Sequence, residues 1–164
     1  SRQPWYKNTL FVITADHTSL STHEEYQTPL GSFRVPIIFF DPSGEMKPGR
    51  LPGIVKQIDI MPTVLGYLGY QHPFIAFGND LTQLPATHNY EVAYLNGVYV
   101  FAQGDYVLLF DGKKTTGLYD FKKDRLLVHD LKGRVPQQAA MERQLKAIIQ
   151  SYMQRMLTDQ VAVR

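Results

Sequence analysis

The sequence contains no cysteine among its 164 residues, which excludes a disulfide framework and any thiolate-based catalytic or metal site. It also has no apolar run approaching the roughly eighteen residues that a bilayer-spanning helix needs. The 17 Lys and Arg residues nearly balance 15 Asp and Glu residues, so the charge excess typical of nucleic-acid-binding proteins is missing and no nucleic-acid partner is expected. With 44% hydrophobic and 12% aromatic residues, the composition predicts a globular domain with an apolar core.

The first residues, Ser1 to Asn8, lack the basic start and apolar stretch of a signal peptide. A strand-like apolar run follows after one short turn, as in a segment cut from a longer protein. We therefore expect the chain to be the C-terminal piece of a larger polypeptide.

Two continuous apolar runs, Thr9 to Ala15 and Val35 to Phe40, predict strands covered on both faces. A long polar loop, Thr18 to Ser32, joins them. Buried strands with a long connection are typical of parallel pairing. The expectation is an α/β fold with parallel core strands.

A short helix is predicted after these strands, from Ile60 to Leu68. Asp59 would be its N-cap, and Pro62 would fall in the first turn, where its missing N–H costs no hydrogen bond. Gly69 would supply the left-handed stop.

In the second half, short runs of aliphatic and aromatic residues alternate with turn residues, which predicts an antiparallel meander over Val92 to Leu131. An amphipathic helix of about twenty residues, starting at Pro136, is predicted to follow. Tyrosines that nearly alternate with aliphatic residues predict sheet packing rather than a stacking surface. We expect residues 1–88 to form the α/β core and residues 89–164 to pack on it as one unit. The turn signals are Asn96-Gly97, Gly104-Asp105 and Asp111-Gly112, and the tyrosines are Tyr90, Tyr94, Tyr99, Tyr106 and Tyr119.

The most informative pair is Asp16-His17, directly after the first apolar run. In open α/β sheets, ligands bind beyond the carboxyl ends of the strands. A carboxylate oxygen and an imidazole nitrogen from one turn can both reach one divalent cation, a mixture that suits zinc or manganese better than calcium. Taken alone, the dipeptide more often has a plainer role, in which Asp16 caps the turn and His17 packs beside it.

Four segments occur in order: TLFVITADHT, RVPIIFFDPSG, QIDIMPTVLGYLGY and FGNDL. Together they resemble the C-terminal part of the sulfatase-like enzymes of the alkaline phosphatase superfamily, and specifically the lipoteichoic acid synthase family of phosphoglycerol transferases. The resemblance covers Asn8 to Leu81 by motif and continues more loosely to the last helix. It implies the C-terminal part of an alkaline-phosphatase-like sandwich.

The resemblance implies that Asp16 and His17 bind the catalytic metal, Mn²⁺ or Mg²⁺ foremost, with Zn²⁺ or Ca²⁺ as alternatives. The remaining ligands, an acidic residue and a nucleophilic threonine, would lie in the upstream half of the same polypeptide. The whole enzyme would transfer a phosphoglycerol group from a phospholipid head group to an acceptor hydroxyl through a covalent threonine intermediate. Upstream transmembrane helices would anchor it at the extracytoplasmic face of the cytoplasmic membrane. The isolated chain, with two ligands and no nucleophile, is expected to be inactive and to hold no ordered metal.

His23 follows His17 by six residues and could contact substrate or donate a proton to the leaving alkoxide; the alternative is a surface loop histidine. Asp59 is explained by helix capping. Arg34 could approach an anionic substrate from the start of its strand, but a solvent-exposed salt bridge is the favoured interpretation. The remaining polar candidates are interpreted as structural or exposed, with Asp80 in a turn: His72, His88, His129 and Asp80.

Two other functions remain open. The same architecture hydrolyses sulfate esters in sulfatases, but these enzymes usually place a sulfate-binding lysine after the acidic pair, and residues 18–34 contain none. The chain could also be a non-catalytic packing or interaction domain. An incomplete sheet would expose an apolar edge beside Thr9 to Ala15, which predicts self-association into a homo-oligomer.

Overall fold

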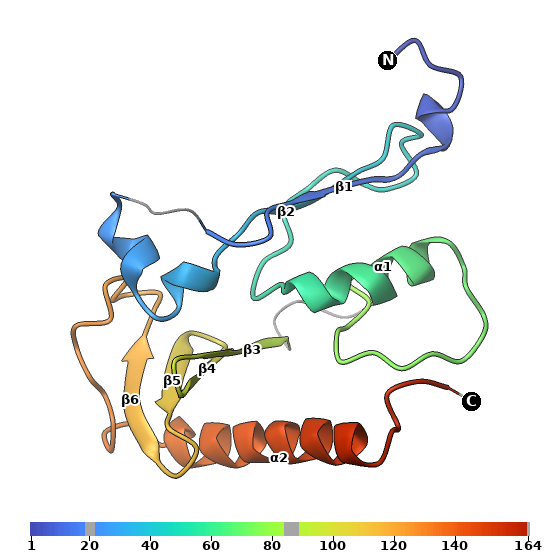
Figure 1. The fold of residues 1–164 in the computed structure, drawn as a ribbon. Coiled ribbons are helices and arrows are strands. Elements are labelled where there is room, and N and C mark those ends of the chain that lie inside the picture. Colours follow the sequence, from blue (N-terminus) through green and yellow to red (C-terminus); the bar gives the residue numbers. More distant parts are fainter. Residues whose placement is uncertain (19–21, 84–88, 164) are drawn as a thin grey trace.

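The computed structural model describes residues 1–18, 22–83 and 89–163. Figure 1 shows a body built from a four-stranded sheet and a long helix, from which a two-stranded arm projects and carries the N-terminus at its far end. The boundary predicted between residues 88 and 89 adjoins a stretch outside the described residues and stays a prediction, and His88 also lies outside them. The elements in chain order are η1 (Tyr6–Asn8), β1 (Phe11–Thr14), η2 (Glu24–Gln27), η3 (Gly31–Phe33), β2 (Ile37–Phe40), η4 (Gln57–Asp59), α1 (Ile60–Tyr67), β3 (Tyr90–Leu95), β4 (Val98–Gln103), β5 (Tyr106–Phe110), β6 (Thr115–Asp120) and α2 (Gln137–Leu157), where η denotes a 3₁₀-helix.

The predicted meander is confirmed as an antiparallel sheet, since β3 to β6 form one sheet in sequence order. The sheet ends at Asp120, and residues 121–131, which the prediction included, contain no strand. Asn96 and Gly97 join β3 to β4 with φ values of 52° and 83°. Positive φ at both central residues is what a type I′ hairpin turn requires, and its twist matches that of the strands. Gly104 and Gly112, also at positive φ, make the two following turns.

Both faces of this sheet are covered. Because side chains alternate along a strand, Phe101 and Leu108 face α2, while Val100 and Val107 face the other side. On the α2 side they pack with Met141 and Leu145 of the helix, and on the other side with partly buried side chains from the first half of the chain. The latter include Leu30 and Ile54.

The predicted helix after Pro136 is confirmed as α2, with 21 residues. Its inward stripe contains Met141 and Leu145, with Ile148 and Ile149 at the margin. Among the described residues, no helix combines the length and the apolar character needed to cross a membrane.

Helix α1 begins where the sequence predicts, with Asp59 at the N-cap position and Pro62 in its early turns. It ends at a Schellman motif, because the Gly69 N–H donates to the Gly66 carbonyl and the Tyr70 N–H donates to the Leu65 carbonyl. Gly69 adopts the predicted left-handed conformation with φ of 65°. The approach to the helix is the 3₁₀-helix η4.

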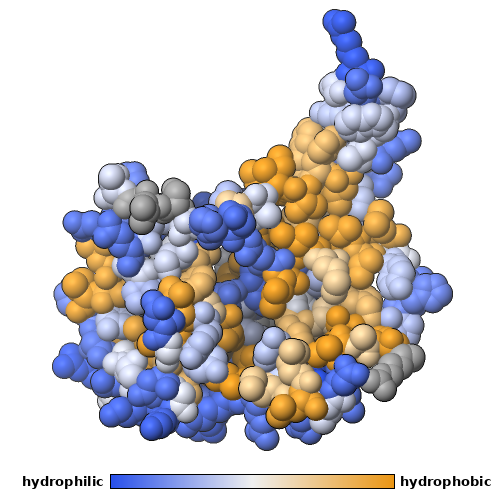
Figure 2. Space-filling view, viewed as in Figure 1, coloured by the Kyte–Doolittle hydropathy of each residue, from blue (hydrophilic) through white to orange (hydrophobic). Residues whose placement is uncertain are grey.

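The prediction of parallel core strands is wrong for β1 and β2, which pair antiparallel, with Phe11 opposite Phe40 and Ile13 opposite Ile38. The connection between them contains the short 3₁₀-helices η2 and η3 in place of a crossover helix, so the chain returns in the opposite direction. The strands are also not covered on both faces within this chain, since Ile13 and Ile38 are 53% and 49% exposed. Figure 2 shows the resulting apolar surface along the arm.

Candidate functional site

Asp16 and His17 lie in the loop that follows β1, and both side chains are exposed, by 86% and 77%. One carboxylate oxygen of Asp16 accepts the His17 backbone N–H at 2.9 Å, so the carboxylate is oriented by its own turn. The second oxygen, Oδ2, lies 3.5 Å from His17 Nε2. The two side chains therefore present an oxygen and a nitrogen in the same direction.

The imidazole of His17 has a defined tautomer. Its Nδ1 lies 2.7 Å from the Thr18 carbonyl oxygen, and because a carbonyl can only accept, Nδ1 carries a proton. This hydrogen bond, followed by the negative charge of Asp16, raises the pKa of His17 above its ordinary value. When His17 is neutral, the lone pair is on Nε2, the nitrogen that faces Asp16.

This geometry fits two ligands of one divalent cation. Metal–ligand bonds of about 2.0–2.2 Å place two adjacent ligands about 2.8–3.1 Å apart at an octahedral angle and about 3.3–3.6 Å apart at a tetrahedral angle. The Nε2 to Oδ2 distance is 3.5 Å. Metal-binding histidines almost always donate the other ring N–H to a carbonyl or carboxylate, as His17 does to Thr18. Among the described residues, no group of three or more His, Cys, Asp or Glu side chains is arranged to hold a metal. The pair would supply two ligands of a larger set.

The loop that carries the pair is held from both sides. Gln57 of η4 donates from its side-chain nitrogen to the Ala15 carbonyl at 2.6 Å, and the Thr18 hydroxyl donates to the Ser32 carbonyl at 2.7 Å. Sequence reasoning missed Gln57. No local signal could have found it, because the contact joins residues 42 positions apart.

The explanation of Asp59 by helix capping is incomplete, because its carboxylate makes no side-chain cap to α1. Asp59 is fully buried. Its two oxygens accept hydrogen bonds from the backbone N–H groups of Lys56 and Asn79 and from the side-chain amide of Asn89. Lys56 Nζ lies 3.0 Å from the same carboxylate and also donates to Asn89. Asp59 thus forms the centre of a buried polar network that links η4 to Asn79 and Asn89.

His23 lies at the N-terminus of η2, with its ring edge-on to Tyr26 at a centroid distance of 6.5 Å. Residues 19–21, which link His23 to the pair, lie outside the described part of the chain. The assignment of His23 as a substrate contact or proton donor stays a prediction.

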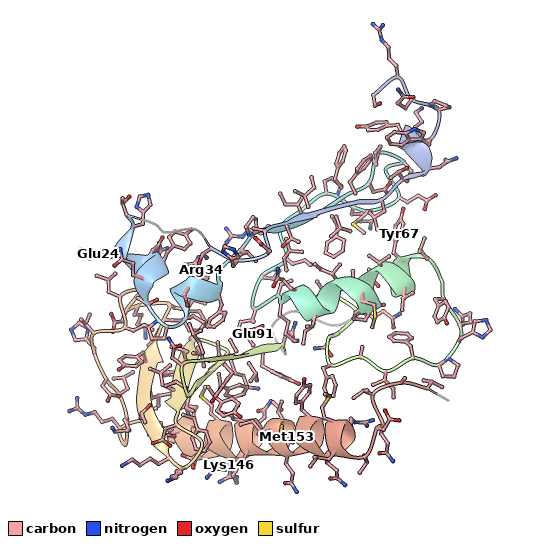
Figure 3. The ribbon with its side chains drawn as sticks, in the orientation of Figure 1. Glu24, Arg34, Tyr67, Glu91, Lys146 and Met153 are labelled. Atoms are coloured by element: carbon pink, nitrogen blue, oxygen red, sulfur yellow. The ribbon has the colours of Figure 1, made fainter. Side chains whose placement is uncertain are left out.

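Arg34 makes the expected surface ion pair, with its guanidinium 3.7 Å from Glu25. Figure 3 shows Arg34 and Glu24 on the η2–η3 segment, at the end of the arm remote from the N-terminus. His129 is held in a turn by Asp124, whose carboxylate lies 3.4 Å from Nδ1 and accepts the His129 backbone N–H. His72 packs against Tyr70, and Asp80 accepts from the Thr82 N–H and hydroxyl, as a turn residue does.

The predicted packing role of the tyrosines holds for four of them, which contact the two core clusters: Tyr90, Tyr99, Tyr106 and Tyr119. Tyr94 differs, since it is 60% exposed and contacts the ring of its cross-strand partner Tyr99 in a tilted arrangement with a centroid distance of 4.6 Å.

Comparison with known proteins supports the broader part of the resemblance. The Sulfatase family model matches residues 2–70, a range that includes Asp16, His17 and Gln57. The structure of Ps i-CgsB in complex with k-i-k-neocarrahexaose superposes with a TM-score of 0.63 at 20% identity, covering 87% of this chain and 36% of that one. A "putative sulfatase from Bacteroides thetaiotaomicron VPI-5482" gives a TM-score of 0.59 at 21% identity, with 93% and 38% covered.

A third structure, BT4656 in complex with its substrate D-glucosamine-2-N,6-O-disulfate, gives a TM-score of 0.60 at 18% identity, with 93% of this chain and 36% of that one covered. The chain thus spans little more than a third of these solved proteins. None of these matches supports the lipoteichoic acid synthase subtype. The α/β fold with its antiparallel sheets and C-terminal helix corresponds to the C-terminal part of sulfatase-like structures, and the segment that contains the Asp16–His17 pair matches the sulfatase family.

Proposed function

We propose that this chain is the C-terminal part of the catalytic region of a metal-dependent sulfuric ester hydrolase. The observation that carries the proposal is the match of residues 2–70 to the sulfatase family, in a segment where Asp16 and His17 present an oxygen and a nitrogen 3.5 Å apart. The reaction would split a sulfate ester with water into an alcohol and inorganic sulfate.

Asp16 and His17 would hold the divalent cation through Oδ2 and Nε2. A bound cation would supply positive charge that stabilises the negative charge developing on the ester oxygens. Mn²⁺ or Mg²⁺ is the proposed metal, with Zn²⁺ and Ca²⁺ as alternatives. The other ligands and the nucleophile would come from the remainder of a longer polypeptide, because the solved relatives are nearly three times as long as the part that this chain covers.

His23 is proposed to donate a proton to the oxygen of the departing alcohol. It follows the metal-binding pair in the same connection and lies at the start of η2. Its place six residues after His17 in the sequence supports this proposal.

Phosphoglycerol transfer remains a second candidate, because residues 18–34 contain no lysine where sulfatases usually have a sulfate-binding one. In that case the donor would be a phospholipid head group, and the enzyme would face the outside of the cytoplasmic membrane. The wider family match favours sulfate esters over this alternative.

The test uses the full-length protein that contains this chain, supplied with Mn²⁺ or Mg²⁺. Release of sulfate from an aryl sulfate and release of glycerol phosphate from a phospholipid are measured on the same preparation. Sulfate release should dominate, and His17→Ala should reduce its kcat/KM by at least about 100-fold, as loss of a metal ligand does.

His129→Ala is the matched control, because His129 is also exposed and also lies beside an aspartate, 3.4 Å from Asp124. It should retain the activity of the unaltered protein. Equal loss of activity in both variants would contradict a metal-binding role for His17, and exclusive glycerol phosphate release would favour the second candidate.

A further inference from the structure

The Asp16–His17 pair has little side-chain packing of its own, since both residues are exposed. Its orientation must therefore come from the backbone on either side. Two hydrogen bonds tie the residues on either side of the pair to distant parts of the sequence. The Gln57 side-chain nitrogen donates to the Ala15 carbonyl at 2.6 Å, and the Thr18 hydroxyl donates to the Ser32 carbonyl at 2.7 Å. The first holds the peptide group that immediately precedes Asp16.

Gln57 belongs to η4, which a buried polar network holds in place. Its neighbour Lys56 is buried, and Lys56 Nζ lies 3.0 Å from Asp59 in the network that also holds Asn79 and Asn89. Every buried side-chain polar atom among the described residues has a partner, so moving η4 would leave buried charges and amides unpaired. The element keeps its place because the penalty for unpaired buried charges and amides is large.

From this arrangement we propose that Gln57 is a positioning residue for the Asp16–His17 pair. By holding the Ala15 carbonyl, it fixes the plane of the Ala15–Asp16 peptide and hence the direction of Asp16 Oδ2 and His17 Nε2. Gln57 acts through the backbone and touches neither the cation nor the substrate. The inference rests on the proposed function, because it assumes that the pair binds a divalent cation.

The experiment compares Gln57→Met with Gln71→Met in the full-length protein. Methionine has nearly the length of glutamine but no N–H, so only the hydrogen bond is removed. Gln71 is a close match, because it is exposed and its side-chain nitrogen also donates to a backbone carbonyl, that of Gly69, at 3.0 Å. It belongs to the loop after α1, outside the segment that holds the pair.

Three quantities are measured: the Mn²⁺ affinity by isothermal titration calorimetry, the kcat and KM for an aryl sulfate, and the melting temperature without metal. Gln57→Met should weaken Mn²⁺ binding by about 3- to 10-fold, the range expected for one hydrogen bond. Its kcat at limiting Mn²⁺ should fall in proportion, and its melting temperature should stay within about 2 °C, because no buried contact is lost. Gln71→Met should leave all three unchanged.

A second variant, Gln57→Glu, separates positioning from direct ligation. Glutamate cannot donate to the Ala15 carbonyl, so at high salt, where attraction between separated charges is screened, it should weaken Mn²⁺ binding as methionine does. If Gln57→Glu still bound Mn²⁺ more tightly than the unaltered protein at high salt, residue 57 would face the cation directly, and the positioning role would be wrong.

Failure of the inference is distinguishable from failure of the proposed function. Unaltered protein that binds Mn²⁺ and releases sulfate, beside a Gln57→Met variant with the same affinity, would overturn the positioning role alone. Unaltered protein that neither binds Mn²⁺ nor hydrolyses the ester would overturn both.

Discussion

Replacing Asp59 with alanine should destabilise the protein more than replacing any of the exposed aspartates described above. Asp59 is fully buried. Its removal deprives two backbone N–H groups and the Asn89 amide of their acceptor, and it leaves the buried ammonium of Lys56 without its counter-charge. Breaking a buried pair by removing one partner costs about 3–5 kcal/mol, against a typical net stability of about 5–15 kcal/mol.

The free energy of unfolding is measured by urea denaturation followed by far-ultraviolet circular dichroism. Fluorescence is less suitable, because the single tryptophan, Trp5, is 53% exposed and lies on the arm rather than at the network. Asp111→Ala is the matched control. Asp111 also accepts two backbone N–H bonds, from Lys113 and Lys114, but it is exposed in a turn, so its loss should cost about 1 kcal/mol or less.

Replacing both charges should cost less than removing one of them. The double variant Lys56→Met with Asp59→Leu leaves no buried charge uncompensated. The two backbone N–H groups and the Asn89 amide still lose their acceptor, so the cost should lie below that of Asp59→Ala without falling to zero. A loss below about 1 kcal/mol for Asp59→Ala, or a loss no larger than that of Asp111→Ala, would refute the assignment of the network as a main support of η4.

Three further outcomes are expected. Burial raises the pKa of the Glu91 carboxyl, an effect that the charge of Lys56 partly offsets (Figure 3). When a carboxyl has a raised pKa in the folded state, the folded protein loses stability as the pH rises through that pKa. Glu91→Gln should therefore raise the melting temperature at pH 8 and have little effect at pH 4, as measured by differential scanning fluorimetry. Gly78→Ala should destabilise by about 1–3 kcal/mol, because the added Cβ would lie 1.9 Å from the backbone oxygen of Ile58; unchanged urea denaturation would refute this. The 164-residue chain should self-associate through the edge beside residues 9–15. Ile13→Lys, at a position 53% exposed, should reduce the mass measured by light scattering. An unaltered chain that is monomeric at high concentration would contradict this expectation.

The parts of the fold that sequence predicted well depend on local chemistry. Asn96-Gly97 specifies a tight hairpin because both residues tolerate positive φ, and Gly69 ends α1 for the same reason. The stripe that contains Met141 and Leu145 repeats at helical spacing, so α2 could be located closely. Each of these signals lies within a few residues of the structure that it determines.

The errors concern contacts between distant residues. The direction in which β2 returns beside β1 depends on the path of the connection, which apolar runs do not encode, so an antiparallel pair looked like a parallel one. Asp59 has the position of an N-cap, but its partners Asn79 and Asn89 lie 20 and 30 residues away. The Asp16–His17 pair can be proposed from its place directly after an apolar run, whereas the hydrogen bond from Gln57 to Ala15 depends on tertiary structure.

The two kinds of contact also set an order of events during folding. In the sheet from β3 to β6, each strand pairs with its neighbour in sequence, and such local pairing closes small loops quickly. The bond from Gln57 to Ala15 closes a separation of 42 residues, which requires η4 and β1 to have met already. A partly folded chain would therefore have the meander formed while the Asp16–His17 loop is still unanchored. During refolding, the amides of this loop should be among the last to become protected against hydrogen exchange.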